Sequence, residues 1–265
     1  MTLNHERRGS GPPLVLIHGI GSQWPAWTPV LDGLAAQRDV IALDLPGFGA
    51  SPPLPAGMTP TVPALANSVM ELLEQLEVSR PHVAGNSMGG WIALELARRG
   101  VVASATALSP AGFWNRREAA YSRASLRLTV RVARALDPVA DRLTSSAAGR
   151  TLLFSQVAAR PWRIPAPDAA AALRALARAP GFDATLTVLT AGHFTGAADI
   201  AVPVTIAWGD RDRLLIPRQA LRAVRAIPGA RLVSLEGCGH VPMSDDPERV
   251  VDVVLEAGAA QDGAP

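Results

Sequence analysis

The chain has 265 residues, of which 48% are hydrophobic and 18% charged, and its net charge is +2. This composition is typical of a globular protein with a large core, and it excludes a disordered, collagen-like or coiled-coil chain. The single cysteine, Cys238, excludes an internal disulfide and a cysteine cluster for a metal ion. Residues 1–8 lack the apolar core of a signal peptide, and no run approaches the ~20 apolar residues of a membrane span. We therefore expect a soluble, cytoplasmic protein.

Short apolar runs alternate with segments of helical periodicity over the first 112 residues. An edge strand is expected within 2–8, and buried strands are expected at 14–17, 40–43, 82–86 and 101–108. Helices are expected between them, at 27–36, 61–76 and 91–99. Such alternation predicts crossover units and a parallel sheet. The pattern then breaks, and helices alone are expected over 113–199.

Alternation resumes near residue 200, with segments expected at 204–208 (strand), 217–227 (helix), 231–235 (strand) and 247–257 (helix). A helical block between two strands of one sheet is an insertion at the carboxyl edge, where such sheets bind ligands. We therefore expect a core of residues 1–112 and 200–265, with residues 113–199 forming a helical lid after the strand ending near Leu108.

Ser87 lies in the run Gly85-Asn86-Ser87-Met88-Gly89, between an apolar strand and a helix. This pattern predicts a sharp strand-to-helix turn that exposes the serine hydroxyl above the strand ends. Gly85 and Gly89 are needed because the strand and the helix pass too closely for side chains. On its own the motif also fits a glycine-rich turn with a surface serine.

Four stretches carry a family resemblance, and they are His18-Gly19-Ile20-Gly21, Gly85 to Gly89, Trp208-Gly209-Asp210-Arg211-Asp212 and Gly237-Cys238-Gly239-His240-Val241-Pro242. Together they resemble the α/β-hydrolase superfamily, in the chain order serine, acid, histidine. The resemblance implies an α/β fold with a mostly parallel sheet flanked by helices. Because the N-terminal segment is short, we expect the family's first strand to be missing, which leaves about seven strands.

The resemblance also implies the roles of the site residues. Ser87 is the nucleophile, His240 the base, and Asp212 the acid that orients it, while Asp210 forms a turn. The backbone N–H groups of Met88 and Ile20 form the oxyanion hole. His18 organises the oxyanion loop. The remaining histidines, His5, His82 and His193, are expected to be structural or exposed.

The helical segment supplies most of the aromatic side chains. Trp114, Phe154 and Trp162, together with Val241, are the predicted substrate contacts, although packing between lid and core is the favoured explanation for any single aromatic residue. Arg123, Arg127, Arg131 and Arg134 fall on one helix face, which is either solvated or contacts an anion.

The predicted function is a serine esterase that cleaves small carboxylic esters with an apolar part, without metal or organic cofactor. A monomer or homodimer is expected, with neither nucleic acid nor membrane as partner. Three alternatives stay open. One is a C–C bond hydrolase of ring-cleavage products, which Asn86 favours and Val241 disfavours. The second is a lactonase or perhydrolase, and the third is a ligand receptor or signalling partner on the same fold. The serine nucleophile disfavours dehalogenases and epoxide hydrolases, which form an ester on a carboxylate.

Overall fold

The computed structural model describes residues 2–262, with side chains through residue 258. A seven-stranded sheet lies at its centre, in the order β1-β3-β2-β4-β5-β6-β7. Only β1 runs antiparallel to its neighbour, and the other pairs are parallel. The strands are β1 (His5–Arg8), β2 (Pro13–Ile17), β3 (Asp39–Leu43), β4 (His82–Asn86), β5 (Ser104–Leu108), β6 (Val204–Gly209) and β7 (Arg231–Leu235). The predicted α/β fold is confirmed.

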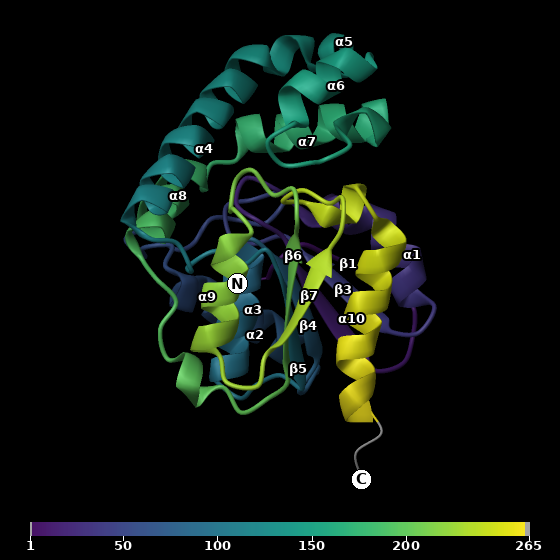
Figure 1. Cartoon of the computed structure of the whole chain (residues 1–265), viewed down its shortest axis with the longest axis vertical. Helices are drawn as coiled ribbons and strands as arrows, with labels where there is room; N and C mark the ends of the chain where they lie inside the picture. The colour runs from purple at the N-terminus through teal and green to yellow at the C-terminus, as the bar shows by residue number, and fades with distance from the viewer. Residues whose placement is uncertain (1, 263–265) are drawn as a thin grey trace.

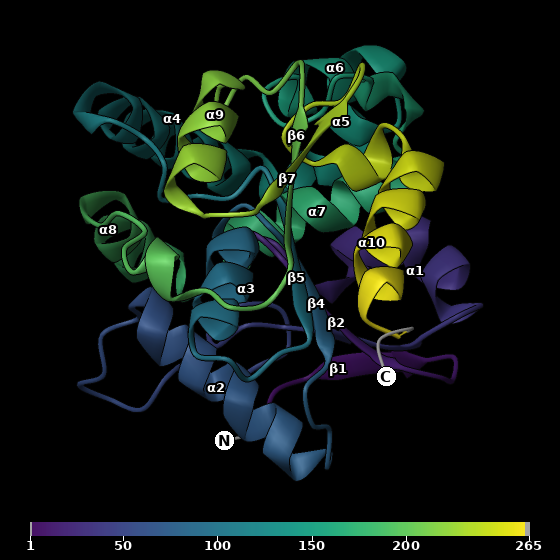
Figure 2. The same cartoon turned by 60° about the horizontal axis from the view of Figure 1, so that its bottom comes forward.

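Helices cover both faces of this sheet (Figure 1). They are α1 (Thr28–Ala35), α2 (Val62–Gln75), α3 (Met88–Arg98), α9 (Arg218–Ala226) and α10 (Pro247–Asp262). Helices α2, α3 and α9 pack on one face, and α1 and α10 pack on the other (Figure 2). In β2, Val15 and Ile17 join the first of these cores, whereas Leu14 and Leu16 join the second. Successive side chains of a strand point to opposite faces, which explains why β2 is apolar throughout.

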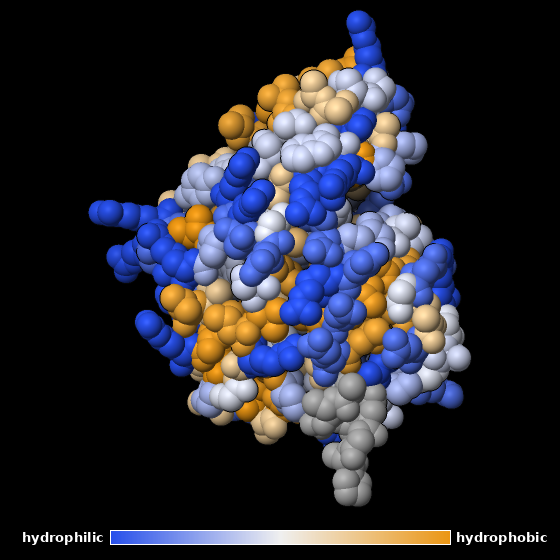
Figure 3. All heavy atoms as spheres, turned by 45° about the vertical axis from the view of Figure 1, so that its right-hand side comes forward, coloured by the Kyte–Doolittle hydropathy of each residue, from blue (hydrophilic) through white to orange (hydrophobic). Residues whose placement is uncertain are grey.

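Between β5 and β6 the chain forms a helical insertion, residues 116–191, over the carboxyl ends of the strands (Figure 1). Its helices are α4 (Arg116–Leu136), α5 (Ala140–Thr144), α6 (Ala147–Phe154), α7 (Ala166–Arg178) and α8 (Phe182–Ala191). Short 3-10 turns complete the structure: η1 (Trp24–Trp27), η2 (Asp137–Val139), η3 (Pro161–Arg163), η4 (Ala197–Asp199) and η5 (Pro242–Ser244). Hydrophilic and apolar side chains both lie on the outer surface of the insertion (Figure 3). Within residues 2–262, no helix is both long and apolar enough to cross a bilayer.

The strand expected over 101–108 begins only at Ser104. The preceding residues end α3: Gly100 has φ 69°, its N–H donates to Ala97 O at 3.0 Å, and the Val101 N–H donates to Leu96 O at 3.4 Å. These two bonds form a helix C-cap in which a glycine is followed by an apolar residue. Val101 is therefore apolar because it caps a helix, and it does not extend the strand.

Candidate active site

Ser87 lies at the sharp turn between β4 and α3, beneath the helical insertion. Its backbone has φ 58° and ψ −115°, a conformation that costs free energy for any residue with a side chain. Three backbone hydrogen bonds hold it. The Ser87 N–H donates to Leu108 O at 2.9 Å, and Ser87 O accepts from the N–H groups of Trp91 at 3.1 Å and Ala111 at 3.0 Å. The turn is thus fixed by its own helix and by the end of β5.

The two glycines around Ser87 are required by close backbone contacts. A Cβ at Gly85 would lie 2.1 Å from Gly89 O, and a Cβ at Gly89 would lie 2.1 Å from Ile17 O. Both distances are too short for any carbon atom, and both neighbours are backbone. These distances confirm the prediction that the strand and the helix pass too closely for side chains at Gly85 and Gly89.

Asp212 and His240 meet at the carboxyl ends of β6 and β7. The His240 Nδ1 donates to Asp212 Oδ2 at 2.7 Å, and the side chains are 4% and 0% exposed. The other oxygen, Asp212 Oδ1, accepts from the N–H groups of Leu214 at 2.9 Å and Leu215 at 2.8 Å. Both carboxylate oxygens are therefore used. With Nδ1 donating, Nε2 is the nitrogen left to accept a proton.

Asn86 links the serine turn to the histidine. Its Nδ2 donates to His240 O at 2.8 Å and to Leu108 O at 3.1 Å. Because both partners are carbonyl oxygens, they fix which way the amide points. No hydrogen bond joins the Ser87 hydroxyl to His240 within the described chain. The hydrogen bond from a nucleophile to its base often forms only in the complex with substrate.

The loop after β2 lies against Ser87. A Cβ at Gly19 would be 3.2 Å from the Cβ of Ser87, so only glycine lets the backbone come this close. The N–H of Ile20 has no hydrogen-bond partner among the described residues. Met88 is the first residue of α3, and its N–H is therefore one of those that a helix leaves unpaired. The two predicted oxyanion donors are both available.

His18 and Asp44 hold this loop from behind. The fully buried His18 donates from Nδ1 to Gly19 O at 2.7 Å, and its Nε2 accepts from the Leu45 N–H at 3.0 Å. Burial lowers the pKa of His18, so the ring is neutral. Asp44 accepts from the N–H groups of Trp24 at 2.7 Å and Ala50 at 2.9 Å. The sequence indicated His18 as a loop organiser but gave no role to Asp44.

The predicted substrate contacts are less uniform in their placement. Trp114 is 5% exposed, donates from its indole nitrogen to Gly192 O and packs edge-on against Trp91. Phe154 packs inside the insertion, and Trp162 is 49% exposed on η3. Val241 lies beside His240, where its N–H donates to Val157 O at 2.8 Å. Of the four, Val241 is the one joined to the histidine loop.

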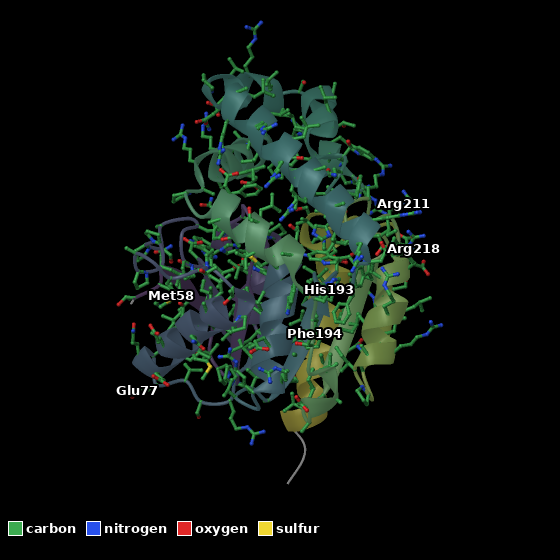
Figure 4. All side chains as sticks on the ribbon, turned by 90° about the vertical axis from the view of Figure 1, so that its left-hand side faces the viewer. Met58, Glu77, His193, Phe194, Arg211 and Arg218 are labelled. Carbon is green, nitrogen blue, oxygen red and sulfur yellow. The ribbon has the colours of Figure 1, made fainter. Side chains whose placement is uncertain are left out.

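Four other residues that could carry chemistry have no hydrogen bond to Ser87, Asp212 or His240 within the described chain. His193 is exposed, next to Phe194 on the segment after α8 (Figure 4). Arg211 lies on the outer surface between the two aspartates (Figure 4). Asp210 accepts from the Gly237 N–H at 2.7 Å, which ties the loops after β6 and β7 together. Burial raises the pKa of Cys238 to about 12, so its thiol stays protonated and is not a nucleophile. Among residues 2–262, no three His, Cys, Asp or Glu side chains are grouped to hold a metal ion.

One buried carboxylate beside the histidine was missed by sequence reasoning. Asp245 is 3% exposed, and its oxygens accept from the N–H groups of Gly239, Ala159 and Arg160. In the sequence it stands in Asp245-Asp246-Pro247, where an aspartate before a proline indicates a helix start. This signal does not tell which aspartate caps the helix, Asp246, and which one is buried, Asp245.

Known proteins of similar sequence and structure identify the family of this chain. The α/β hydrolase family model matches residues 14–253. An uncharacterized protein of Mycobacterium tuberculosis is 35% identical over 263 residues, which cover 93% of this chain and 75% of that protein. Epoxide hydrolase EphH of the same organism is 30% identical over 202 residues, covering 72% of this chain and 91% of its own. The crystal structure of a membrane phospholipase A, a bacterial virulence factor, superposes with a TM-score of 0.79 and 28% identity, covering 99% and 84% of the two chains. The chain belongs to the α/β hydrolase family.

Proposed function

We propose that the protein is a serine hydrolase that cleaves small carboxylic esters through an acyl-enzyme on Ser87. The observation that carries the proposal is the buried His240–Asp212 hydrogen bond of 2.7 Å next to a serine held at φ 58°. A hydroxyl is a weak nucleophile unless a base takes its proton as it attacks. In this proposal His240 is that base, and its hydrogen bond to Asp212 supports the role by fixing the tautomer.

In the proposed mechanism, Ser87 Oγ attacks the ester carbonyl while His240 Nε2 takes its proton. The N–H groups of Ile20 and Met88 stabilise the negative charge on the former carbonyl oxygen. The imidazolium then gives its proton to the leaving alcohol, and the acyl group stays on Ser87. Water, deprotonated by His240, attacks the acyl-enzyme and releases the carboxylic acid. We propose that the Ser87–His240 contact tightens when substrate binds.

We also propose that residues 113–199 act as a lid domain and that the substrate has an apolar part. Leu176 and Phe182 of the insertion face Gly21 next to the oxyanion loop, and a Cβ there would lie 2.4 Å from Leu176 and 3.1 Å from Phe182. On the other side, Val157 and Val241 are joined by the hydrogen bond beside His240. Apolar side chains thus pack against the oxyanion loop, and apolar residues adjoin His240, as expected for a site that binds an acyl chain or an apolar alcohol.

The chemistry of a serine nucleophile favours ester cleavage over epoxide opening for this chain. Phospholipases A cleave carboxylic esters, and the phospholipase structure is 28% identical. The similarity to an epoxide hydrolase meets a chemical difficulty, because a serine that opens an epoxide forms an ether. Water cannot readily hydrolyse that ether, whereas it can hydrolyse the ester formed by a carboxylate nucleophile.

The test is hydrolysis of p-nitrophenyl esters from acetate to decanoate by the wild type, Ser87→Ala and Ser109→Ala. Ser109 is a matched control, since it is buried at the end of β5 with φ 44° and its hydroxyl has no hydrogen-bond partner in the described chain. We expect Ser87→Ala to lower kcat by about 10⁴-fold or more. Ser109→Ala should stay within about 3-fold of the wild type, because truncating a side chain that touches no reacting atom removes no transition-state interaction.

The chain length with the highest kcat/KM measures the acyl pocket. Wild-type protein that hydrolyses none of these esters, or Ser87→Ala protein that keeps its activity, would contradict the proposal. If the wild type hydrolyses none of these esters, ring-cleavage dienoic acids are the next substrates, because a C–C hydrolase uses the same three residues.

A further inference from the structure

The insertion contacts the loop that carries His240, and this inference rests on the proposed role of that histidine. Three residues in a row are held by hydrogen bonds. The Gly239 N–H donates to Asp245 Oδ2 at 2.8 Å, His240 O accepts from Asn86 at 2.8 Å, and the Val241 N–H donates to Val157 O at 2.8 Å. The backbone of His240 is therefore fixed on both sides, and Val157 belongs to the segment after α6.

The Asp245 carboxylate ties that same segment to the histidine loop. Besides the Gly239 N–H, Oδ2 accepts from the Ala159 N–H at 2.8 Å, and Oδ1 accepts from the Arg160 N–H at 2.7 Å. Arg160 Nη1 also donates to Asp245 O at 3.3 Å. One buried carboxylate thus joins two distant chain segments, since Asp245 and Ala159 are 86 residues apart in sequence.

The contact leaves no space for adjustment. A Cβ at Gly239 would lie 2.8 Å from Ala159 N and 2.9 Å from Val157 O, so the two backbones touch directly. A carboxylate accepting several N–H bonds in a buried place is strongly held, because each unpaired N–H there costs free energy. Movement of the segment 157–160 would therefore move Gly239 and the neighbouring His240.

We propose that Asp245 is a positioning residue through which the helical insertion sets the place of His240. It touches neither substrate nor the reacting atoms. Its effect reaches the reaction through the alignment of His240 with Asp212 and Ser87. The insertion in this view helps to build the catalytic site in addition to covering it.

The test compares Asp245→Asn with Asp246→Asn. An asparagine in place of Asp245 can accept with only one side-chain atom, so at least one of the three N–H groups faces an NH₂ donor whichever way the amide points. Asp246 is the matched control, since its Oδ1 accepts from the Arg249 N–H at 3.1 Å at the start of α10, and asparagine caps helices equally well. We expect Asp245→Asn to lower kcat on the preferred p-nitrophenyl ester by about 10- to 100-fold, with KM within about 3-fold, because a misplaced base costs rate and not binding. Asp246→Asn should keep the wild-type kcat.

Two further measurements do not depend on ester hydrolysis. Asp245→Asn should speed amide exchange at Gly239, Ala159 and Arg160. It should also shift or broaden the low-field Nδ1–H resonance of His240, assigned by its loss in Asp212→Asn. Asp245→Glu, which keeps two acceptor oxygens, should recover part of the lost kcat, and it carries the test if Asp245→Asn does not fold.

The outcomes separate this inference from the proposed function. If the wild type shows no Ser87-dependent turnover, the esterase proposal fails, and faster exchange with a changed resonance still supports the coupling. If the wild type is active and Asp245→Asn leaves kcat, exchange and the resonance unchanged, the inference is overturned.

Discussion

Burial fixes the protonation state of His18, and this makes the stability of the protein depend on pH. The ring has no solvent contact, and burial lowers its pKa below the ordinary 6.5. As the pH falls below that value, the unfolded chain takes up a proton that the folded protein does not. The free energy of unfolding should therefore decrease toward acid, by up to about 1.4 kcal/mol per pH unit for this one proton.

Urea unfolding of the wild type and His18→Gln at pH 7.5 and 5.5 checks this prediction. Glutamine offers both a donor and an acceptor for Gly19 O and the Leu45 N–H, but it does not titrate. We expect a smaller loss of stability between the two pH values in His18→Gln than in the wild type. Equal losses would mean that His18 titrates alike in the folded and unfolded states. Because each variant is compared with itself at the two pH values, a pH-independent change in its free energy of unfolding cancels.

The first helix of the insertion, α4, is held to α9 of the core by a buried carboxylate. Asn115 and Glu118 form a capping box at the start of α4. Glu118 is 6% exposed and accepts from Arg218 Nε of α9 at 2.8 Å, and Arg222 donates to its other oxygen. Arg222 also donates from Nε to Phe113 O at 2.6 Å. The carboxylate thus caps one helix and pairs with another.

Glu118→Gln should lower the free energy of unfolding by about 2 kcal/mol, because it weakens charge-assisted hydrogen bonds to a buried group. Glu256→Gln is the control, since the Arg231–Glu256 pair at 2.9 Å is half exposed on both sides. An exposed pair contributes about 0.5 kcal/mol or less, so this variant should be close to the wild type. Chemical unfolding measures both, and equal effects of the two substitutions would argue against the fastening role of Glu118.

Strands and helices with strong periodicity could be predicted from the sequence, whereas contacts between distant loops could not. The elements from β2 to β5 and from β6 to α10 lie near their expected ranges, since parallel strands are continuous apolar runs and their helices repeat at 3.6 residues. The predicted start of a strand at Val101 was wrong, because an apolar residue that follows a helix can cap that helix. The joining of Asp245 to the segment 157–160 has no local signal, because its partners are backbone N–H groups far away in the chain.

The positions of Ser87, Asp212 and His240 could be predicted because each follows a strand of one sheet. Carboxyl ends of parallel strands meet at the same edge, so the order of motifs along the chain already brings these residues together. The placement of the predicted substrate contacts could not be predicted in the same way. Trp114 is 5% exposed because it packs against Trp91 and bonds to Gly192, whereas Trp162 on η3 is 49% exposed, and no local sequence signal separates the two.

At the scale of the whole molecule, the insertion contacts the core on two sides of the candidate site. The Gly181 N–H donates to Gly47 O at 3.0 Å on the oxyanion side, and Asp245 holds the segment 157–160 on the histidine side. Ser87, Asp212 and His240 are each less than a tenth exposed. Burial of these residues lowers the local dielectric constant, which would strengthen the interactions of the proposed oxyanion and imidazolium.

The proposed reaction requires Ser87 to be a nucleophile activated by His240 and Asp212, and covalent labelling measures this most directly. The protein is treated with a fluorophosphonate, and the intact mass and the labelled peptide are determined for the wild type, Ser87→Ala and Asp212→Asn. We predict one adduct per wild-type chain, on the peptide that contains Ser87, no adduct in Ser87→Ala, and labelling of Asp212→Asn slower by about 10³-fold or more. An adduct on another residue, or labelling of Asp212→Asn at the wild-type rate, would contradict the account.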